Sequence, residues 1–120
     1  MPNTLQNLNI LIVEDEVITA MDVAATVEYA GGTVLGPCNS VQDALDLIEH
    51  NTIHAAILDV NLRDGDVWPL LERLRAHGIF VIVYSSAGLP KEMTKRHPGL
   101  SFFHKPMPHA VLARALINAF

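Results

Sequence analysis

The stretch Leu8-Asn-Ile-Leu-Ile-Val13, followed at once by Glu14-Asp15-Glu16, decides the fold and points to the site. A short run that is apolar at nearly every position is typical of a strand buried on both faces, because a strand with one solvated face alternates apolar and polar residues. The same kind of run recurs at Ala55–Leu58 and Ile79–Tyr84. Such strands need helices on both faces of their sheet, which predicts an α/β fold.

Helical patterns separate the strands. Residues 17–30 are predicted as a helix that ends at Gly31-Gly32 and buries one face, formed by Val17, Ala20, Met21, Ala24 and Val27. Ser40 and Asp66 are predicted to cap the next two helices, and Asp64 to lie in a turn. The other predicted elements are strands at 33–36 and 100–103, at most two helical turns within 88–99, and a helix at 109–119. The prediction is a doubly wound, five-stranded parallel sheet.

Composition excludes several classes of protein. The chain has 120 residues, which predicts one domain over 1–120 with no room for a separate output module. The net charge of −5 argues against direct binding to nucleic acid, although residues 67–120 hold seven bases and two acids. No apolar run is long enough for a membrane span. The single Cys38 favours a reducing, cytoplasmic setting.

Chemically active side chains follow four of the five predicted strands. Glu14-Asp15-Glu16 follow the first, Asp59 and Asn61 the third, Ser85 the fourth, and His104-Lys105-Pro106 the fifth. The carboxyl ends of parallel strands meet at one edge of a sheet, where such folds place their chemistry. The sequence therefore predicts a site of carboxylates, a hydroxyl and a lysine at that edge.

This set of groups restricts the chemistry. Carboxylates packed together raise one another's pKa unless a cation lies among them, and a hard ion such as Mg²⁺ suits oxygen ligands. Asp15, Asp59, one further acid, the metal and Lys105 together come near neutrality, so the site can accept a phosphoryl group. A carboxylate can attack phosphorus to give an acyl phosphate.

Simpler interpretations exist for each residue alone. Glu16 is predicted as a helix cap, Asp59 alone can form a turn, and Ser85 or Lys105 alone is an ordinary surface residue. His104 and His109 are predicted to be solvated, Cys38 to be a buried small side chain, and Trp68 to belong to the core. The coincidence of four groups at successive strand ends favours the functional interpretation.

The ordered motifs resemble the receiver domain of two-component response regulators, the CheY-like family, and a stand-alone receiver in particular. Ile10-Leu-Ile-Val-Glu-Asp-Glu16 resembles the first strand and acidic pair, Ala56-Ile-Leu-Asp-Val-Asn-Leu62 the phosphoacceptor segment, and Phe103-His-Lys-Pro106 the lysine–proline signature. The resemblance implies the strand order 2-1-3-4-5. The chain differs from the usual pattern in Ser86, in Phe102 where tyrosine is common, and in the short segment 87–99.

The resemblance also implies roles for particular residues. Asp59 would accept a phosphoryl group from a sensor histidine kinase or a histidine phosphotransfer protein. Glu14, Asp15, Asp59 and the backbone carbonyl of Asn61 would hold Mg²⁺ or Mn²⁺. Lys105 would contact the phosphoryl group, with a cis peptide bond to Pro106. Ser85 and Phe102 would be the switch residues.

The expected function is a phosphorylation switch, not an enzyme beyond its own phosphotransfer and dephosphorylation. It would signal by contact with an unidentified downstream protein, as a monomer or weak dimer, without a membrane. One alternative is a receiver-like binding module that needs no phosphate. Another is a small Mg²⁺-dependent phosphatase with an aspartyl phosphate, which is disfavoured because Asn61 stands where such an enzyme needs a second acid.

Overall fold

The computed structural model describes residues 4–62 and 65–120, in which five parallel strands alternate with five helices. The strands are β1 (Asn9–Val13), β2 (Thr33–Cys38), β3 (Ala55–Leu58), β4 (Phe80–Ser85) and β5 (Ser101–His104). The helices are α1 (Val17–Tyr29), α2 (Val41–His50), α3 (Trp68–Ala76), α4 (Lys91–Arg96) and α5 (His109–Asn118). The strands form one sheet in the order β2-β1-β3-β4-β5, so the predicted fold class is confirmed.

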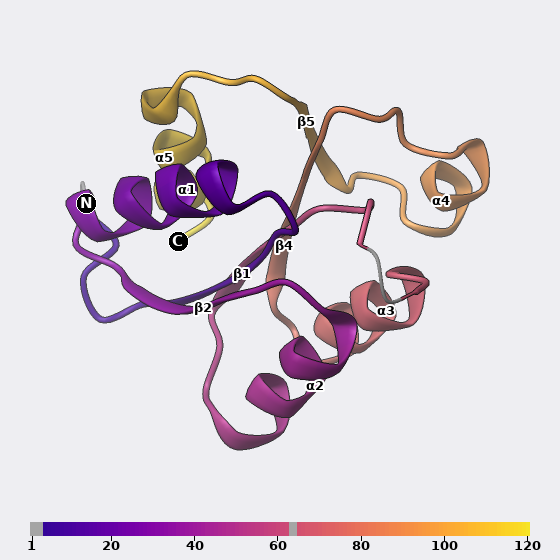
Figure 1. Cartoon of the computed structure of the whole chain (residues 1–120), viewed down its shortest axis with the longest axis horizontal. Coiled ribbons are helices and arrows are strands. Elements are labelled where there is room, and N and C mark those ends of the chain that lie inside the picture. The colour runs from indigo at the N-terminus through magenta and orange to yellow at the C-terminus, as the bar shows by residue number, and fades with distance from the viewer. Residues whose placement is uncertain (1–3, 63–64) are drawn as a thin grey trace.

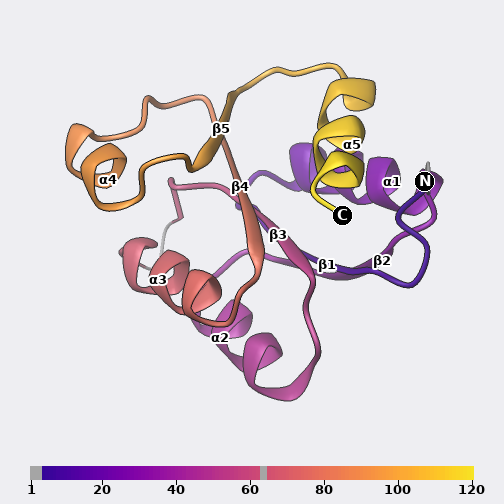
Figure 2. The same ribbon diagram turned by 180° about the vertical axis from the view of Figure 1, so that it is seen from behind.

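Two hydrophobic clusters cover the two faces of the sheet. Helices α1 and α5 lie on one face, and α2 and α3 lie on the other (Figures 1 and 2). Successive residues of β1 show the division, because Ile10 and Ile12 pack with α1 and α5 whereas Leu11 and Val13 pack toward α2 and α3. Burial of both faces explains why the central strands are apolar throughout.

The predicted inner face of α1 is wrong in part. Val17 and Met21 were expected to be buried, but 71% and 64% of their surfaces are exposed. The buried residues of α1 are instead Ala20, Val23, Thr26 and Val27. Apolar residues occur on both sides of this helix, so their spacing alone does not decide which side packs on the sheet.

Strand β2 is longer than predicted, because it continues beyond Gly36 to Cys38. Gly36 has φ +95°, and a Cβ there would lie 2.7 Å from the Cys38 nitrogen and 2.9 Å from the Ile12 oxygen. Only glycine fits this close approach of two strands. Beyond it, the Cys38 oxygen accepts the Glu14 N–H at 2.8 Å, so the end of β2 fixes the first acid after β1.

The predicted caps are largely confirmed. Ser40 Oγ accepts the Asp43 N–H at 3.1 Å at the start of α2. Asp66 Oδ1 accepts the Trp68 N–H at 3.0 Å, although Val67 occupies the cap position of α3. Asp64 lies outside the described residues. Trp68 packs against the cluster on the α2 and α3 side, and among the described residues no helix has the length and apolar character of a membrane span.

The segment between β4 and β5 contains only the short helix α4, as predicted. It has six residues, of which Met93 is buried. Arg96 Nη1 lies 3.3 Å from Glu72 Oε1, which connects α4 to α3 by an exposed ion pair. Such a pair contributes little to stability, so α4 depends mainly on the packing of Met93.

Gly36→Ala is expected to lower the free energy of unfolding by roughly 2 kcal/mol, because the methyl group meets backbone atoms at a positive φ. Urea denaturation measures the change. Gly88→Ala is the matched control, since a Cβ at Gly88 would have no neighbour within 4 Å. Equal stability of the two variants would contradict the assigned role of Gly36.

Candidate functional site

Backbone hydrogen bonds at the carboxyl edge of the sheet bring the predicted site residues together. The Asp59 N–H donates to the Val13 oxygen at 2.9 Å, which sets the end of β3 beside the end of β1. The Lys105 N–H donates to the Ser85 oxygen at 3.0 Å, which sets the end of β5 beside the end of β4. The backbone hydrogen bonds of the parallel strands therefore place these side chains at one edge of the sheet.

The ammonium group of Lys105 is the centre of the site. Its Nζ lies 2.6 Å from Glu14 Oε1, 2.9 Å from Glu16 Oε1 and 3.0 Å from Asp59 Oδ2. The side chains of Lys105, Glu14 and Asp59 are 9%, 4% and 5% exposed, whereas that of Glu16 is 64% exposed. One cation thus contacts two buried carboxylates and one exposed carboxylate.

The charges in this cluster do not balance, and the pKa values show the consequence. Burial, and after it a hydrogen bond shared with Asp59, raise the pKa of Glu14 from 4.5 to about 7, against the effects of Lys105 and of the Glu16 N–H. Burial also tends to raise the pKa of Asp59, but hydrogen bonds from Glu14, the Asn61 N–H and Lys105 lower it overall. Below about pH 7, Glu14 therefore holds a proton, which removes one negative charge from the cluster as a second cation would compensate it.

Lys105 itself stays charged. Burial by itself lowers the pKa of an ammonium group, but hydrogen bonds to Glu14, Glu16 and Asp59 raise that of Lys105 above its ordinary value. A permanently charged lysine at a buried carboxylate can stabilise negative charge that develops on an incoming group.

The donor set fits a hard divalent cation. Glu14, Glu16 and Asp59 each offer a carboxylate oxygen, and these oxygens all lie within 4.8 Å of one another. Oxygen ligands are those that Mg²⁺ and Mn²⁺ prefer, and a dication would favour the charged form of Glu14, which burial and the neighbouring Asp59 disfavour. The cluster can therefore hold such an ion.

Asp15 and Asn61, two of the predicted metal ligands, lie beside this cluster. Asp15 lines a cavity with Glu14, Met21 and Asp43, and its carboxylate is not among the three grouped oxygens. The Asn61 N–H donates to Asp59 Oδ1 at 3.0 Å. The metal-binding roles of Asp15 and of the Asn61 carbonyl remain predictions.

The two predicted switch residues lie on neighbouring strands. Ser85 is fully buried at the end of β4, and its Oγ accepts the Ala87 N–H at 3.2 Å. Phe102 is half-buried against the cluster on the α2 and α3 side, with its ring centroid 6.4 Å from that of His104. The cis peptide bond between Lys105 and Pro106 is present as expected. The switching roles themselves remain predictions.

The contacts of Glu16 and Tyr84 with Lys105 were not predicted from the sequence. Glu16 occupies the N-cap position of α1, but its side chain makes no capping hydrogen bond and instead contacts Lys105. Tyr84 places its ring 5.7 Å from Lys105 Nζ. The run of three acids was a signal for Glu16, whereas Tyr84 looked like an ordinary member of an apolar strand.

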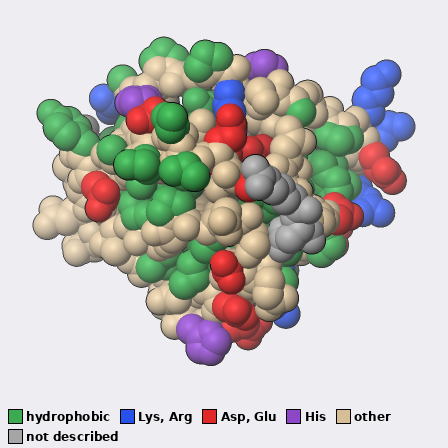
Figure 3. Space-filling model, in the orientation of Figure 1, with side chains coloured by type: hydrophobic (Ala, Val, Ile, Leu, Met, Phe, Trp, Pro, Cys, Tyr) green, Lys and Arg blue, Asp and Glu red, His purple; other side chains and the backbone are tan. Residues whose placement is uncertain are grey.

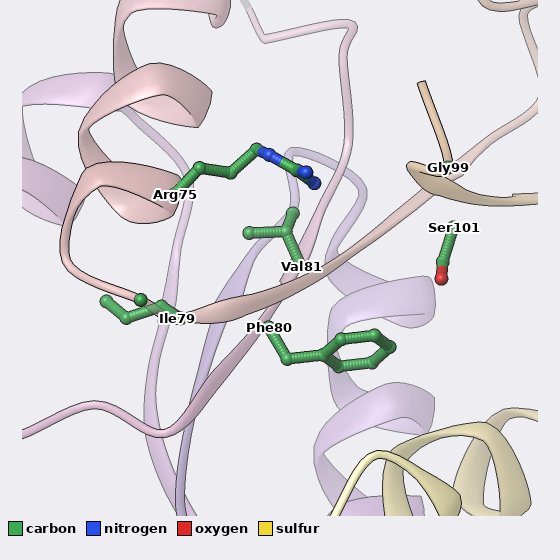
Figure 4. A pocket seen from close by; sticks show the side chains of 7 residues that line it. Arg75, Ile79, Phe80, Val81, Gly99 and Ser101 are labelled. Atoms are coloured by element: carbon green, nitrogen blue, oxygen red, sulfur yellow. The ribbon is translucent and has the colours of Figure 1, made fainter. Parts of the chain in front are cut away.

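A separate cavity of about 410 Å³ lies at the opposite end of β4 (Figure 4). Arg75 extends across it above Val81, toward Gly99 and Ser101 at the start of β5 (Figure 4). Among the described residues, those that line this cavity include no carboxylate and no thiol. The groups needed for metal binding and nucleophilic attack lie at the other edge of the sheet.

The chain is similar to known proteins of one family. The model of the response regulator receiver domain family matches residues 10–116. SdrG from Sphingomonas melonis Fr1 has 34% sequence identity over 98% of this chain and 97% of its own, with a TM-score of 0.77. No curated protein matches the chain significantly.

Other solved structures share the fold. A CheY-like receiver domain from Methylobacillus flagellatus is 26% identical over 94% of this chain and 98% of its own, with a TM-score of 0.78. A CheY-like receiver domain from Methanospirillum hungatei JF-1 is 20% identical over 93% and 92%, with a TM-score of 0.84. The second likeness concerns the fold alone.

Glu14→Gln is expected to stabilise the metal-free protein at pH 8 by about 1–2 kcal/mol, and to change little at pH 5. Between pH 4.5 and about 7 the folded protein keeps a proton on Glu14 that the unfolded chain has released. The contribution of Glu14 to the free energy of unfolding therefore falls as the pH rises, and glutamine removes this loss. Urea denaturation with a chelator at both pH values is the measurement; a variant less stable than the wild type at pH 8 would refute the assignment.

Proposed function

This chain belongs to the response regulator receiver domain family, and on that premise we propose that it is a phosphorylation switch that accepts a phosphoryl group on Asp59. The observation that carries the proposal is the surroundings of that carboxylate. Asp59 Oδ2 lies 3.0 Å from Lys105 Nζ, and Asp59 Oδ1 accepts the Asn61 N–H at 3.0 Å. The carboxylate is buried, ionised and oriented, which are the properties that a nucleophile needs.

The donor is a phosphohistidine of a sensor kinase or of a histidine phosphotransfer protein. An oxygen of Asp59 attacks phosphorus, and the bond between phosphorus and the imidazole nitrogen breaks. The electron pair of that bond stays on the nitrogen, which takes up a proton, and an acyl phosphate forms on Asp59. Lys105 moves from the Asp59 carboxylate to the phosphoryl oxygens and offsets their charge.

The proposed metal ligands are Glu14, Asp15, Asp59 and the backbone carbonyl of Asn61. A bound Mg²⁺ or Mn²⁺ would supply positive charge in addition to that of Lys105, which would offset the negative charge on the oxygens of the transferring phosphoryl group. The buried Glu14 holds a proton below about pH 7, and it must release that proton before it can serve as a ligand.

The surroundings of Ser85 support the proposed switch. Its Oγ now accepts the Ala87 N–H, so a turn toward the phosphoryl group would release the loop that leads to α4. Phe102 is half-buried and lies on the strand beside β4, where it can follow that movement. Two conformations biased by a phosphoryl group are the basis of such a switch.

Two surfaces suit the partners. Val17, Ile18 and Met21 in the first turns of α1 expose apolar side chains, and they closely follow Glu14 and Glu16 in the sequence. Figure 3 shows apolar side chains beside acidic ones on this face of the molecule, where a phosphodonor protein would have to approach Asp59. Lys91, Lys95 and Arg96 lie on α4 and suit an acidic downstream protein. In this proposal the protein works in the cytoplasm by protein contact, without binding nucleic acid or membrane, as a monomer or weak dimer.

Acetyl phosphate with Mg²⁺ is expected to add the mass of one phosphoryl group to the protein, measured by intact mass spectrometry. Asp59→Asn removes the adduct because an amide is not a nucleophile, and a chelator suppresses it. Asp66→Asn is the matched control, since Asp66 is exposed and its carboxylate accepts the Trp68 N–H at the start of α3, away from the predicted site. Absence of any adduct, with or without a beryllofluoride mimic, favours a phosphate-independent binding module. Rapid turnover of phosphate esters favours a phosphatase.

Mn²⁺ affinity, measured by electron paramagnetic resonance at pH 8, tests the proposed ligands. Glu14→Gln and Asp15→Asn are expected to weaken binding at least about tenfold, because each removes a carboxylate from the ion. Glu16→Gln is expected to weaken it less, since this carboxylate is exposed and contacts Lys105. A larger loss with Glu16→Gln than with Asp15→Asn would mean that the three grouped carboxylates hold the metal instead.

A further inference from the structure

Tyr84 lies beside Lys105 and is buried, with 7% of its surface exposed. It precedes Ser85 in β4 and packs on the face of the sheet that α1 and α5 cover. A buried tyrosine needs a partner for its hydroxyl group. Here Tyr84 Oη accepts the Met107 N–H at 3.0 Å, so the hydroxyl group is hydrogen-bonded to the backbone two residues after Lys105.

The segment 105–108 has few ways to attach itself to the sheet. Pro106 and Pro108 have no N–H, so Lys105 and Met107 supply its only backbone donors. The Lys105 N–H donates to the Ser85 oxygen, and the Met107 N–H donates to Tyr84 Oη. Two consecutive residues of β4 therefore accept both backbone hydrogen bonds that this segment can donate.

The ring of Tyr84 acts on the lysine side chain as well. Lys105 Nζ lies 5.7 Å from the ring centroid, within the range of a cation–π interaction. Beside these two side chains is a cavity of about 150 Å³, lined also by Thr19, Asp22 and Met107. The Lys105 side chain therefore has room to turn away from Asp59 into this cavity, toward α1. The Tyr84 ring lines the same cavity and occupies part of the space beside the lysine.

We propose that Tyr84 is a positioning residue for phosphotransfer, which holds Lys105 at Asp59 through the Met107 N–H and through its ring. This inference rests on the proposed function of Asp59 as phosphoacceptor. The hydroxyl group fixes the backbone on the far side of Lys105, and the ring limits where the ammonium group can move. Both contacts act before a phosphoryl group arrives, so Tyr84 lowers the cost of orienting Lys105 in the reaction.

The test compares rates of phosphorylation by acetyl phosphate with Mg²⁺, followed by intact mass. Tyr84→Phe keeps the ring and removes the hydroxyl group, and it is expected to slow phosphorylation about three- to tenfold. Tyr29→Phe is the matched control, because 98% of Tyr29 is exposed, and its rate should equal that of the wild type. Amide hydrogen exchange of Met107 should accelerate in Tyr84→Phe and not in Tyr29→Phe.

A double-mutant cycle separates positioning from a merely structural role. In a Lys105→Gln background, Tyr84→Phe should cause no further loss of rate, because the residue through which Tyr84 acts is gone. An equal loss in both backgrounds, or an unchanged rate in the single variant, would overturn the inference. If the wild type itself forms no phosphoryl adduct, the function proposed for Asp59 fails. In that case, faster hydrogen exchange of the Met107 amide in Tyr84→Phe still supports the contact between the Tyr84 hydroxyl group and the backbone. Unchanged exchange of that amide overturns the contact as well.

Discussion

The contact of one ammonium group with three carboxylates is the interaction on which the site depends. Glu14 and Asp59 are buried, and like charges so close in a region of low polarity would repel each other without a cation between them. Lys105 supplies one positive charge, and Glu14 compensates for the missing second by holding a proton. The site thus carries more negative charge than its one lysine balances, and its three carboxylate oxygens could hold a divalent cation that compensates the difference.

The buried Glu14 carboxylate of this site lowers the free energy of unfolding near neutral pH. A buried carboxylate whose pKa is raised to about 7 destabilises the folded protein near neutral pH, and an amide in its place would not. The rest of the fold compensates with strands that are buried on both faces and with side chains such as Leu58 and Ile82 that are fully buried. Local conflict at a site within an otherwise consistent fold is characteristic of a functional position.

Most of the fold could be predicted from the sequence because its strands are short, apolar runs with clear ends. The positions of Glu14, Asp59 and Lys105 followed in turn, since parallel strands must end at one edge. The buried face of α1 could not be predicted, because Val17 and Met21 are as apolar as the residues that do pack. The contact of Glu16 with Lys105 spans 89 positions in the sequence, and local cap rules favoured a different partner for that side chain.

The short helix α4 has little stability of its own. Six residues make fewer than two turns, which do not hold together in water without tertiary support. That support comes mainly from Met93, since the ion pair of Arg96 with Glu72 is exposed on both sides. A helix with a single buried side chain has the features of segments that open locally without global unfolding. The side chains of Lys91, Lys95 and Arg96 therefore stand on a helix that one buried methionine holds to the rest of the fold, and any loss of that packing would disturb all three at once.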